Sequence, residues 1–266
     1  MDARSKTTPR PQAKLDLGTL HIPTGSEVLA QELREKILRK LPPGAVLPNE
    51  RELVNQLGVS RMVVREALRI LEAEGLVVIR QGRKGGPVVQ RPDDRSIAKA
   101  LAISLYFEGA TFADLLETRR LLESLCARSA AQRATLNDVR SLRESNARYR
   151  SSLSNADEYI QENLRFHLLI TAASRNAVFR LLANAVRNLV HQCTADLELN
   201  KDLREAALDA HERIVDAIEA GNADLAQRRM EKHLLANEDV FTRHYGDTTR
   251  MQFGCDRGQL YLVPSG

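Results

Sequence analysis

The chain has 266 residues, which is enough for two domains, and its 39 Lys and Arg outnumber its 35 Asp and Glu to give a formal net charge of +4. No apolar run approaches the roughly 20 residues that a membrane span requires, and the polar first residues lack the apolar centre of a signal peptide. The three cysteines lie far apart, which argues against a disulfide framework or a cysteine metal site. We therefore expect a cytoplasmic protein without a membrane segment.

The positive charge is concentrated towards the N-terminus. Residues 1–95 contain 17 Lys and Arg against 12 Asp and Glu, which leaves 22 of the 39 basic and 23 of the 35 acidic residues for the remainder. A basic excess confined to one region is typical of proteins that contact nucleic acid. The N-terminal part is therefore the candidate for DNA binding.

The first expected helix follows a polar segment. Residues 1–24 are broken by prolines and are expected to form a flexible arm. A helix is predicted from about Glu27 to Lys40, because apolar residues recur there at helical spacing. The residues expected on its inner face are Val28, Leu29, Leu33, Ile37 and Leu38.

A short helix and a tight turn are predicted next. Asn49 can cap the helix, and Glu52, three residues later, can reach back to complete a capping box. Leu53 and Leu57 are the expected buried stripe of this helix. Gly58 begins the turn that ends it.

A second helix, capped by Ser60, is predicted to carry two different faces. Its apolar positions, at helical spacing, are Val64, Ala67, Leu68 and Leu71. Its arginines, four residues apart on another face, are Arg61, Arg65 and Arg69. Such a helix can pack on its own domain with one side and meet phosphates and base edges with the other.

Residues 76–89 predict a β-hairpin with a basic tip. Leu76–Ile79 is apolar and β-branched, Gln81–Gly86 is basic and rich in glycine, and Pro87–Val89 is the expected returning strand. A wing of this kind suits contact with the DNA backbone and the minor groove. The alternative is a plain helical hairpin with solvated arginines, followed by an ordinary β-turn.

Several of these motifs in order resemble the winged helix-turn-helix of GntR-type bacterial transcription regulators. They are Leu47–Leu53, Gly58–Arg61, Val64–Leu68, Leu71–Leu76 and Arg80–Gly82. The resemblance implies that the DNA-binding residues are Arg51, Ser60, Arg61, Met62, Arg65, Gln81 and Gly82, with Ser60 on a phosphate and Gly82 at the minor groove. Met62 lies where a small hydroxyl residue is common, and it offers the operator no hydrogen bond.

The remainder of the chain predicts an all-α unit. From residue 97 to about 245, glycine is rare, proline is absent and apolar residues recur every three or four positions. Helices are expected near residues 95–108, 111–132, 136–152, 156–173, 177–197, 203–219 and 223–244. Short connections favour an antiparallel bundle, whose interior can hold a ligand or a metal. Residues 247–266 show no clear period, and we assign them no structure.

Three histidines of this bundle form a candidate metal site. His167 lies four residues after Asn163, so both project from the same helical face. His211 and His233 flank the turn at Gly221 at similar distances, and an antiparallel pair of helices would bring them level. Three converging imidazoles suit a divalent transition metal such as zinc or nickel. Taken singly, each histidine is more often an ordinary core or surface residue.

The bundle also resembles the ligand-binding FCD domain of the FadR subgroup of GntR regulators. The resemblance lies in Glu117–Arg119, Leu122-Glu123, Phe166-His167, Ala173–Asn176, His211–Val215 and Met230–Leu234. It implies the metal ligands Asn163, His167, His211 and His233, with Asn163 in place of the usual aspartate. An amide oxygen is a neutral ligand, so the site would lose one negative charge.

The same resemblance implies that Arg119 contacts the effector. A guanidinium suits bidentate capture of a carboxylate. The alternative is an intrahelical ion pair between Arg119 and Glu123, four residues apart. The acidic residues of this helix are interpreted as solvated pairs rather than as acid or base catalysts.

Together these observations predict a mainly α protein with four parts: a flexible arm (1–24), a winged helix-turn-helix (25–91), an all-helical ligand-binding and dimerisation domain (92–246) and a tail (247–266). The resemblance implies that the protein is a homodimeric, ligand-responsive transcriptional regulator, most often a repressor in this family, that binds a palindromic operator and a small carboxylate effector. A metal-sensing regulator is the alternative, and a metal-dependent hydrolase fused to a DNA-binding head is a third reading. We expect no enzymatic activity, because no nucleophile or general base has a convincing partner.

Overall fold

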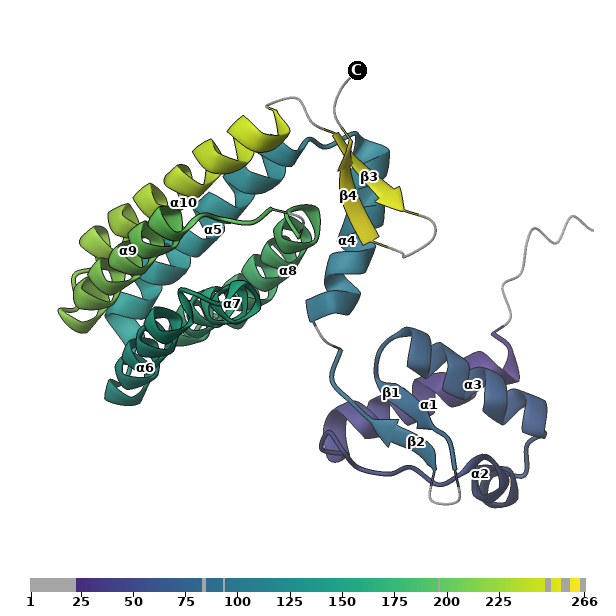
Figure 1. Ribbon diagram of the computed structural model, residues 1–266. Helices are drawn as coiled ribbons and strands as arrows, with labels where there is room; N and C mark the ends of the chain where they lie inside the picture. The colour runs from purple at the N-terminus through teal and green to yellow at the C-terminus, as the bar shows by residue number, and fades with distance from the viewer. Residues whose placement is uncertain are drawn as a thin grey trace, which may run out of the picture. The chain divides into compact units, whose positions relative to one another are not determined.

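The computed structural model describes residues 23–82, 85–92, 94–195, 197–246, 250–254 and 259–263. The chain divides into two compact units, Met1–Pro92 and Asp93–Gly266, and each is described by itself (Figure 1). The flexible arm expected over residues 1–24 lies, except for its last two residues, outside the described part of the chain.

The described part of the N-terminal unit contains three helices and a two-stranded sheet (Figure 1). The helices are α1 (Gly25–Lys40), α2 (Glu50–Leu57) and α3 (Arg61–Ala73), and the strands are β1 (Val77–Arg80) and β2 (Gly86–Val89). The strands are antiparallel, with Val77 opposite Val89 and Arg80 opposite Gly86. The buried core consists of Leu29, Ala30, Leu33, Ile37, Leu47, Leu53, Val64, Ala67, Leu68, Leu71, Leu76, Val77 and Val89.

Local capping explains where these helices begin and end. The side chain of Asn49 accepts a hydrogen bond from the backbone of Glu52, and the Glu52 carboxylate accepts one from the backbone of Asn49, each at 3.0 Å. Gly58 ends α2 with a left-handed φ of 68°, which glycine adopts without steric cost. Ser60 caps α3 by accepting a hydrogen bond from the backbone of Val63. The geometry of the helix-turn-helix is therefore determined by local interactions among a few consecutive residues.

Three residues expected in this core are instead exposed. Val28 is 51% exposed, Leu38 is 68% exposed and Leu57 is 41% exposed. Leu29, Leu33 and Ile37 form one stripe of α1, and a residue directly next to such a stripe is rotated about 100° away from it. Val28 and Leu38 occupy those neighbouring positions. Leu57 is the last residue of α2, where the chain already turns away at Gly58.

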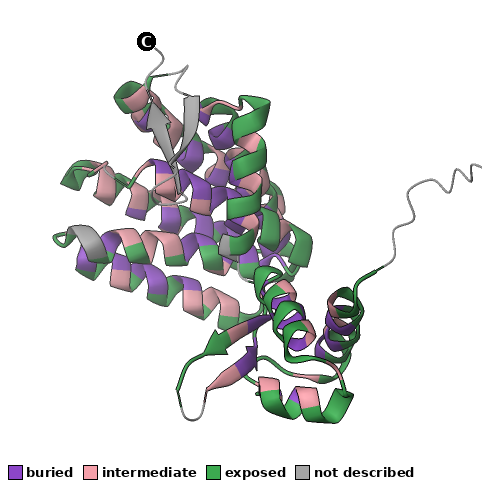
Figure 2. Ribbon diagram, turned by 90° about the vertical axis from the view of Figure 1, so that its right-hand side faces the viewer, coloured by how far each residue is buried: buried purple, intermediate pink, exposed green. Residues whose placement is uncertain are grey.

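The second unit contains seven described helices arranged as a bundle. They are α4 (Asp94–Glu108), α5 (Phe112–Arg133), α6 (Leu136–Ser152), α7 (Ala156–Ala173), α8 (Ala177–Cys193), α9 (Lys201–Glu219) and α10 (Ala223–Tyr245). Helix α5 is central, because it packs against α7, α8, α9 and α10. The buried faces of the helices turn towards one another (Figure 2). Any residue on the inner face of α5 is therefore removed from water on several sides.

Most of these helix limits agree with the sequence prediction, and two differ by more than one residue. Thr111 and Thr135 form capping boxes with Asp114 and Asp138, which fixes the starts of α5 and α6. Helix α8 ends at Cys193 rather than near residue 197. Helix α9 begins at Lys201 rather than near residue 203, because the Asn200 side chain caps it.

The C-terminal segment contains a hairpin that the sequence pattern did not predict. Strands β3 (Arg250–Gly254) and β4 (Gln259–Val263) are antiparallel, with Arg250 opposite Val263. The hairpin packs against α4 and α8 (Figure 1). Among the described helices, none is long and apolar enough to cross a membrane.

Candidate functional site

The start of α3 presents the candidate DNA-contacting residues. Ser60 is the cap of this helix, and Arg61, Met62 and Arg65 follow on its first two turns. Arg61 and Arg65 are exposed, and Met62 is 82% exposed. The opposite face, with Val64, Ala67, Leu68 and Leu71, is buried in the core. A helix with one face buried and its basic N-terminal turns in solvent has the geometry of a recognition helix.

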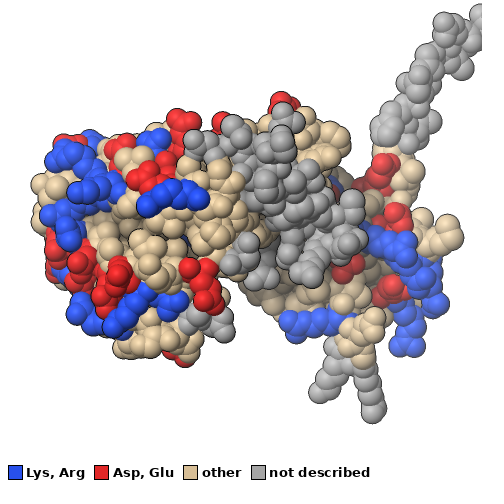
Figure 3. Space-filling model, turned by 45° about the horizontal axis from the view of Figure 1, so that its top comes forward, with Lys and Arg blue, Asp and Glu red and all other residues tan. Residues whose placement is uncertain are grey.

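A shallow cleft brings residues of the helix-turn-helix and the wing together. Arg51 of α2 and Arg61 of α3 line it, together with Asn49, Glu50, Leu68, Ile79, Gly86 and Pro87. Arg51 and Arg61 lie ten residues apart in the sequence, so the turn between the two helices places both guanidinium groups on one concave surface. On the face seen in Figure 3, Lys and Arg of the N-terminal unit are interspersed with acidic residues.

The wing tip depends on two glycines. Gly82 has a φ of +109°, a conformation that other residues rarely adopt. A side chain at Gly85 would place its Cβ atom 2.2 Å from the backbone oxygen of Arg80, so only glycine fits. Gln81 is exposed beside Gly82. The two basic residues of the tip, Arg83 and Lys84, lie outside the described residues.

The basic face of α3 is partly neutralised from within the protein. Arg65 forms an ion pair with Glu50 of α2, with its Nη2 atom 3.1 Å from Oε2. The hydrogen bond to Glu50 raises the pKa of Arg65. Arg69 pairs with Glu66 at 3.7 Å. These pairs are exposed to solvent, so phosphate groups of DNA can compete for the arginines.

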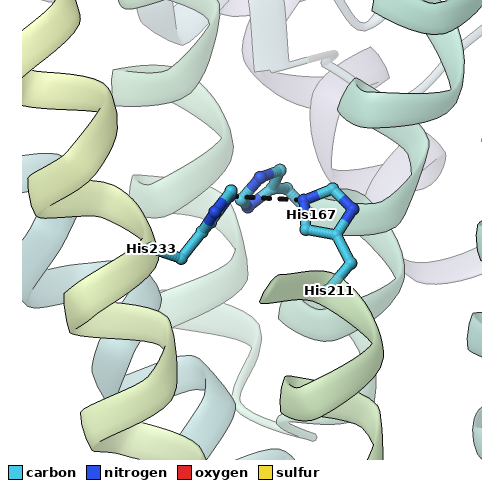
Figure 4. A group of neighbouring side chains, drawn as sticks. All are labelled: His167, His211 and His233. Carbon is cyan, nitrogen blue, oxygen red and sulfur yellow. Dashed lines mark hydrogen bonds between the residues drawn. The ribbon is translucent and has the colours of Figure 1, made fainter. Parts of the chain in front are cut away.

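The three histidines of the helical unit converge in its interior. His167 extends from α7, His211 from α9 and His233 from α10, and their rings point towards one another (Figure 4). One nitrogen atom from each lies within 4.8 Å of the others, and the Nε2 atoms of His211 and His233 are 3.3 Å apart. All three side chains are buried. Residues from three separate helices are thus assembled into one compact cluster.

Aromatic neighbours hold one of these rings in place. Phe166 stacks on the His211 ring with centroids 3.8 Å apart and an interplanar angle of 12°. Tyr149 of α6 meets the same ring edge-on at 5.5 Å. Phe166 and Tyr149 are almost fully buried, so the His211 imidazole is held by packing before any ligand binds.

The electrostatic environment keeps these imidazoles neutral. Burial holds the pKa values of His211 and His233 well below the usual value, and the repulsion that a protonated neighbouring imidazole would exert acts in the same direction. Burial also lowers the pKa of His167, although the nearby Glu123 carboxylate opposes this shift. Neutral imidazole is the form that donates a lone pair to a metal.

The cluster fits a divalent transition metal. Tetrahedral zinc with Zn–N bonds of about 2.0–2.1 Å separates its ligand atoms by about 3.3 Å, the spacing found between His211 and His233. Both ring nitrogens of His167 are buried and have no hydrogen-bond partner among the described residues, and its Nδ1 atom lies 2.5 Å from a Glu123 oxygen. Buried polar atoms normally have a partner, and a bound ion would supply one.

Glu123 belongs to this cluster, although the sequence interpretation treated it as a solvated residue. Its carboxylate is fully buried, with Oε1 accepting a hydrogen bond from Nε of Arg119 at 3.0 Å and Oε2 lying 2.5 Å from Nδ1 of His167. Burial opposes ionisation, but His167 and Arg119 outweigh it and hold the pKa of this carboxyl well below its usual range. The expected alternative for Arg119, an intrahelical pair with Glu123, is therefore present, but it is buried.

Arg119 also lines a pocket that is rich in cationic groups. The side chains of Arg119 and Arg187 are both buried and share this pocket with half-buried His191 and Asn163. Burial and the two guanidinium charges lower the pKa of His191. Asn163 stands one helical turn before His167 on α7, so the pocket lies next to the histidine cluster. An anionic ligand would be favoured here.

A second groove reaches the cluster from another side. It lies between α9 and α10, and His233 is part of its wall. Its lining is mainly alanine and leucine, with Arg213, Arg229 and Lys232 as the basic residues. The histidine cluster is therefore bordered by a cationic pocket and by a more apolar groove.

The chain matches two protein families over these two units. Residues 26–85 match bacterial regulatory proteins of the gntR family, and residues 114–236 match the FCD domain. The HTH-type transcriptional regulator LutR of Bacillus subtilis (strain 168) is 30% identical over 216 residues, which cover 79% of this chain and 98% of LutR. The chain belongs to the GntR family of bacterial regulators.

Other relatives agree with this GntR-family assignment. A protein of Escherichia coli (strain K12), described as an L-lactate dehydrogenase operon regulatory protein, is 33% identical over 235 residues, covering 85% of this chain and 89% of its own length. The solved structure of Streptococcus agalactiae GntR aligns with a TM-score of 0.65 and 26% identity, covering 81% of this chain and 99% of its own. This GntR-family protein is thus a DNA-binding transcriptional regulator with a ligand-binding helical unit, and proteins of this family are regulators rather than enzymes.

Proposed function

We propose that this regulator binds a palindromic operator as a homodimer, and that its helical unit holds a divalent transition metal, zinc or nickel, together with a small organic anion that alters operator affinity. One observation carries the proposal. Three buried, neutral imidazoles converge beside a pocket that contains two buried arginines. Neither a packed core nor a solvated surface requires this combination.

His167, His211 and His233 are the proposed metal ligands, with the Asn163 amide oxygen as a weak fourth. A neutral set of ligands leaves the full charge of the cation in place, so the ion would supply an electrophilic position for an anionic oxygen. The chain supplies the rest of the site. Phe166 fixes the His211 ring, and burial lowers the pKa of all three imidazoles.

The proposed effector is a small carboxylate that Arg119 binds. Its guanidinium can hold two carboxylate oxygens, and Arg187 and His191 add further donors in the same pocket. The similarity to a regulator of an L-lactate dehydrogenase operon makes 2-hydroxycarboxylates the first class to test. A hydroxyl next to the carboxylate could share the metal with it.

The proposed DNA interface lies in the N-terminal unit and combines the start of the recognition helix, helix α2 and the wing. Its residues are Ser60, Arg61, Met62 and Arg65 of the recognition helix, Arg51 of α2, and Gln81 and Gly82 of the wing. Two such units in a dimer would read half-sites about one helical turn apart. An effector regulates binding only if it has different affinities for the two arrangements of these units.

Metal content tests the first part of the proposal. Protein purified without chelator or metal-affinity tag should contain close to one zinc or nickel per chain, and both His167→Ala and His211→Ala should lose it. His244→Ala is the matched control, because His244 is an exposed histidine of the same bundle. A metal-free wild-type protein, or metal retained in both cluster variants, would overturn the assignment.

Operator binding at fixed salt tests the second part. We expect L-lactate or another short hydroxycarboxylate to change operator affinity in the wild type but not in Arg119→Ala. If removal and return of the metal alone switch operator binding, and no carboxylate has an effect, the ion itself is the effector and the metal-sensing alternative holds.

A further inference from the structure

Glu123 occupies an unusual position between two functional groups. It is a fully buried carboxylate on the central helix α5, and its two oxygens face different partners. Oε1 accepts a hydrogen bond from Arg119, and Oε2 lies against Nδ1 of His167. One carboxylate is thus shared between the candidate effector-binding arginine and a candidate metal ligand.

The contact with Glu123 determines which nitrogen of His167 can bind a metal. A carboxylate accepts hydrogen bonds, so its neighbour Nδ1 must carry the proton of the neutral ring. The lone pair then resides on Nε2. Both ring nitrogens are buried and lack a hydrogen-bond partner among the described residues, but Nδ1 lies 2.5 Å from Oε2 of Glu123, whereas Nε2 has no such contact with a carboxylate. A carboxylate on the far nitrogen of a metal-bound histidine also raises the basicity of the ligand.

We propose that Glu123 is a positioning residue that fixes the tautomer and orientation of His167 and couples the metal site to Arg119. We do not assign it as a metal ligand, because Oε1 accepts a hydrogen bond from Arg119 and Oε2 lies 2.5 Å from Nδ1 of His167. The sequence motif did not assign it this role.

Because Arg119 and His167 share one carboxylate, metal binding and anion binding should affect each other in a defined direction. An anion that binds Arg119 competes with Glu123 for the guanidinium and leaves the carboxylate to His167. A metal on Nε2 of His167 makes the Nδ1 proton a stronger donor, which draws Glu123 towards His167 and releases Arg119 for an anion. Binding of the metal therefore raises the affinity for the anion, and binding of the anion raises the affinity for the metal, as reciprocal linkage requires.

The first experiment needs no metal and no effector. Histidines are labelled with 15N in the metal-free protein, and the tautomer of each ring is identified from its nitrogen shifts, with His167→Gln to assign the signals. We expect His167 to be a single Nδ1–H tautomer in the wild type and a mixture in Glu123→Gln, whose amide can donate as well as accept. A wild-type ring in the Nε2–H form, or no change in Glu123→Gln, would overturn the proposal.

The second experiment measures affinity for Co²⁺, whose visible spectrum reports ligand geometry. We expect Glu123→Gln to weaken binding 10- to 100-fold and to alter the spectrum. Arg119→Gln should bind Co²⁺ at least as tightly as the wild type, because Glu123 then serves His167 alone. Glu117→Gln, an exposed glutamate of the same helix, is the matched control and should bind like the wild type.

The outcomes separate this inference from the proposed function on which it rests. Equal weakening in Glu123→Gln and Arg119→Gln would show a merely structural effect and would contradict the coupling. If the wild type binds no Co²⁺ but His167 changes tautomer in Glu123→Gln, the metal function fails while the positioning role of Glu123 stands.

Discussion

The two units of this regulator contain similar ion pairs in opposite environments. In the N-terminal unit, the Arg65 and Glu50 side chains are 54% and 38% exposed. In the helical unit, the Arg119 and Glu123 side chains are 7% and 1% exposed. The N···O distances are nearly the same, 3.1 and 3.0 Å, so the difference between the pairs lies in their surroundings rather than in their geometry.

This difference fits what each unit is proposed to bind. DNA is a large polyanion that meets the protein from outside, so its partners must be exposed and their internal pairs must break easily. A small effector or a metal must be enclosed, and its partners are held in place by packing and by other buried charges. The following variants test whether the two pairs differ as strongly as their burial suggests.

The largest expected effect is on the stability of the helical unit. Glu123→Ala leaves Arg119 and His167 without their carboxylate in a buried site, and removal of one member of such a pair typically costs about 3–5 kcal/mol. Urea denaturation of the metal-free protein, followed by circular dichroism, measures this loss.

Glu50→Ala is the matched comparison in the N-terminal unit. Because the Arg65–Glu50 pair is exposed, we expect its urea midpoint to stay close to that of the wild type. Equal destabilisation by the two variants would show that burial does not distinguish the pairs.

Arg61→Ala should produce the next largest effect, on DNA affinity instead of stability. Arg61 lines the cleft between α2, α3 and the wing, and an arginine that reads a base or a phosphate contributes about 1–3 kcal/mol. Titration of an operator fragment should show about a ten- to hundredfold weaker binding. Arg228→Ala, which removes the same charge from an exposed site in the helical unit, should leave DNA affinity unchanged.

Gly58→Ala should destabilise the turn between α2 and α3 by about 1 kcal/mol, because alanine is strained at its φ of 68°. A Cβ atom at this position meets nothing within 4 Å, so the effect comes from the backbone alone. Gly25→Ala is the control, since a Cβ atom there makes only ordinary contact with Val63 and its φ is not in the left-handed region. A destabilisation in Gly25→Ala as large as in Gly58→Ala would contradict this account.

The same contrast explains how much the sequence could predict. The helix-turn-helix depends on local interactions, such as the capping box between Asn49 and Glu52 and the left-handed turn at Gly58, and these are visible as spacings of a few residues. The starts of α5 and α6 are likewise fixed by residues three positions apart. Local spacing therefore predicts most element limits in both units.

The interior of the helical unit is only partly visible in the sequence. The spacing of His211 and His233 around Gly221 indicates that they lie level, and the structure places them 3.3 Å apart. The role of Glu123 is hidden, because an i,i+4 pair with Arg119 looks the same in the sequence whether it is solvated or buried. Only the packing of four helices around α5 decides that it is buried. Strands β3 and β4 have only five residues each, which is too short for a clear period, and the sequence pattern predicted no structure for them.

The smallest expected effect tests the exposed pair directly. Glu50→Gln keeps the shape of the side chain but frees Arg65 for phosphate, so operator affinity at low salt should rise a few-fold. This gain should fade as salt increases, because exposed charges are screened. Glu219→Gln makes the same charge change far away in the sequence, on an exposed pair with Arg143, and should have no such effect. Weaker operator binding by Glu50→Gln would instead mean that the ion pair orients Arg65 for DNA. Glu50 would then be a positioning residue for Arg65, as Glu123 is proposed to be for His167.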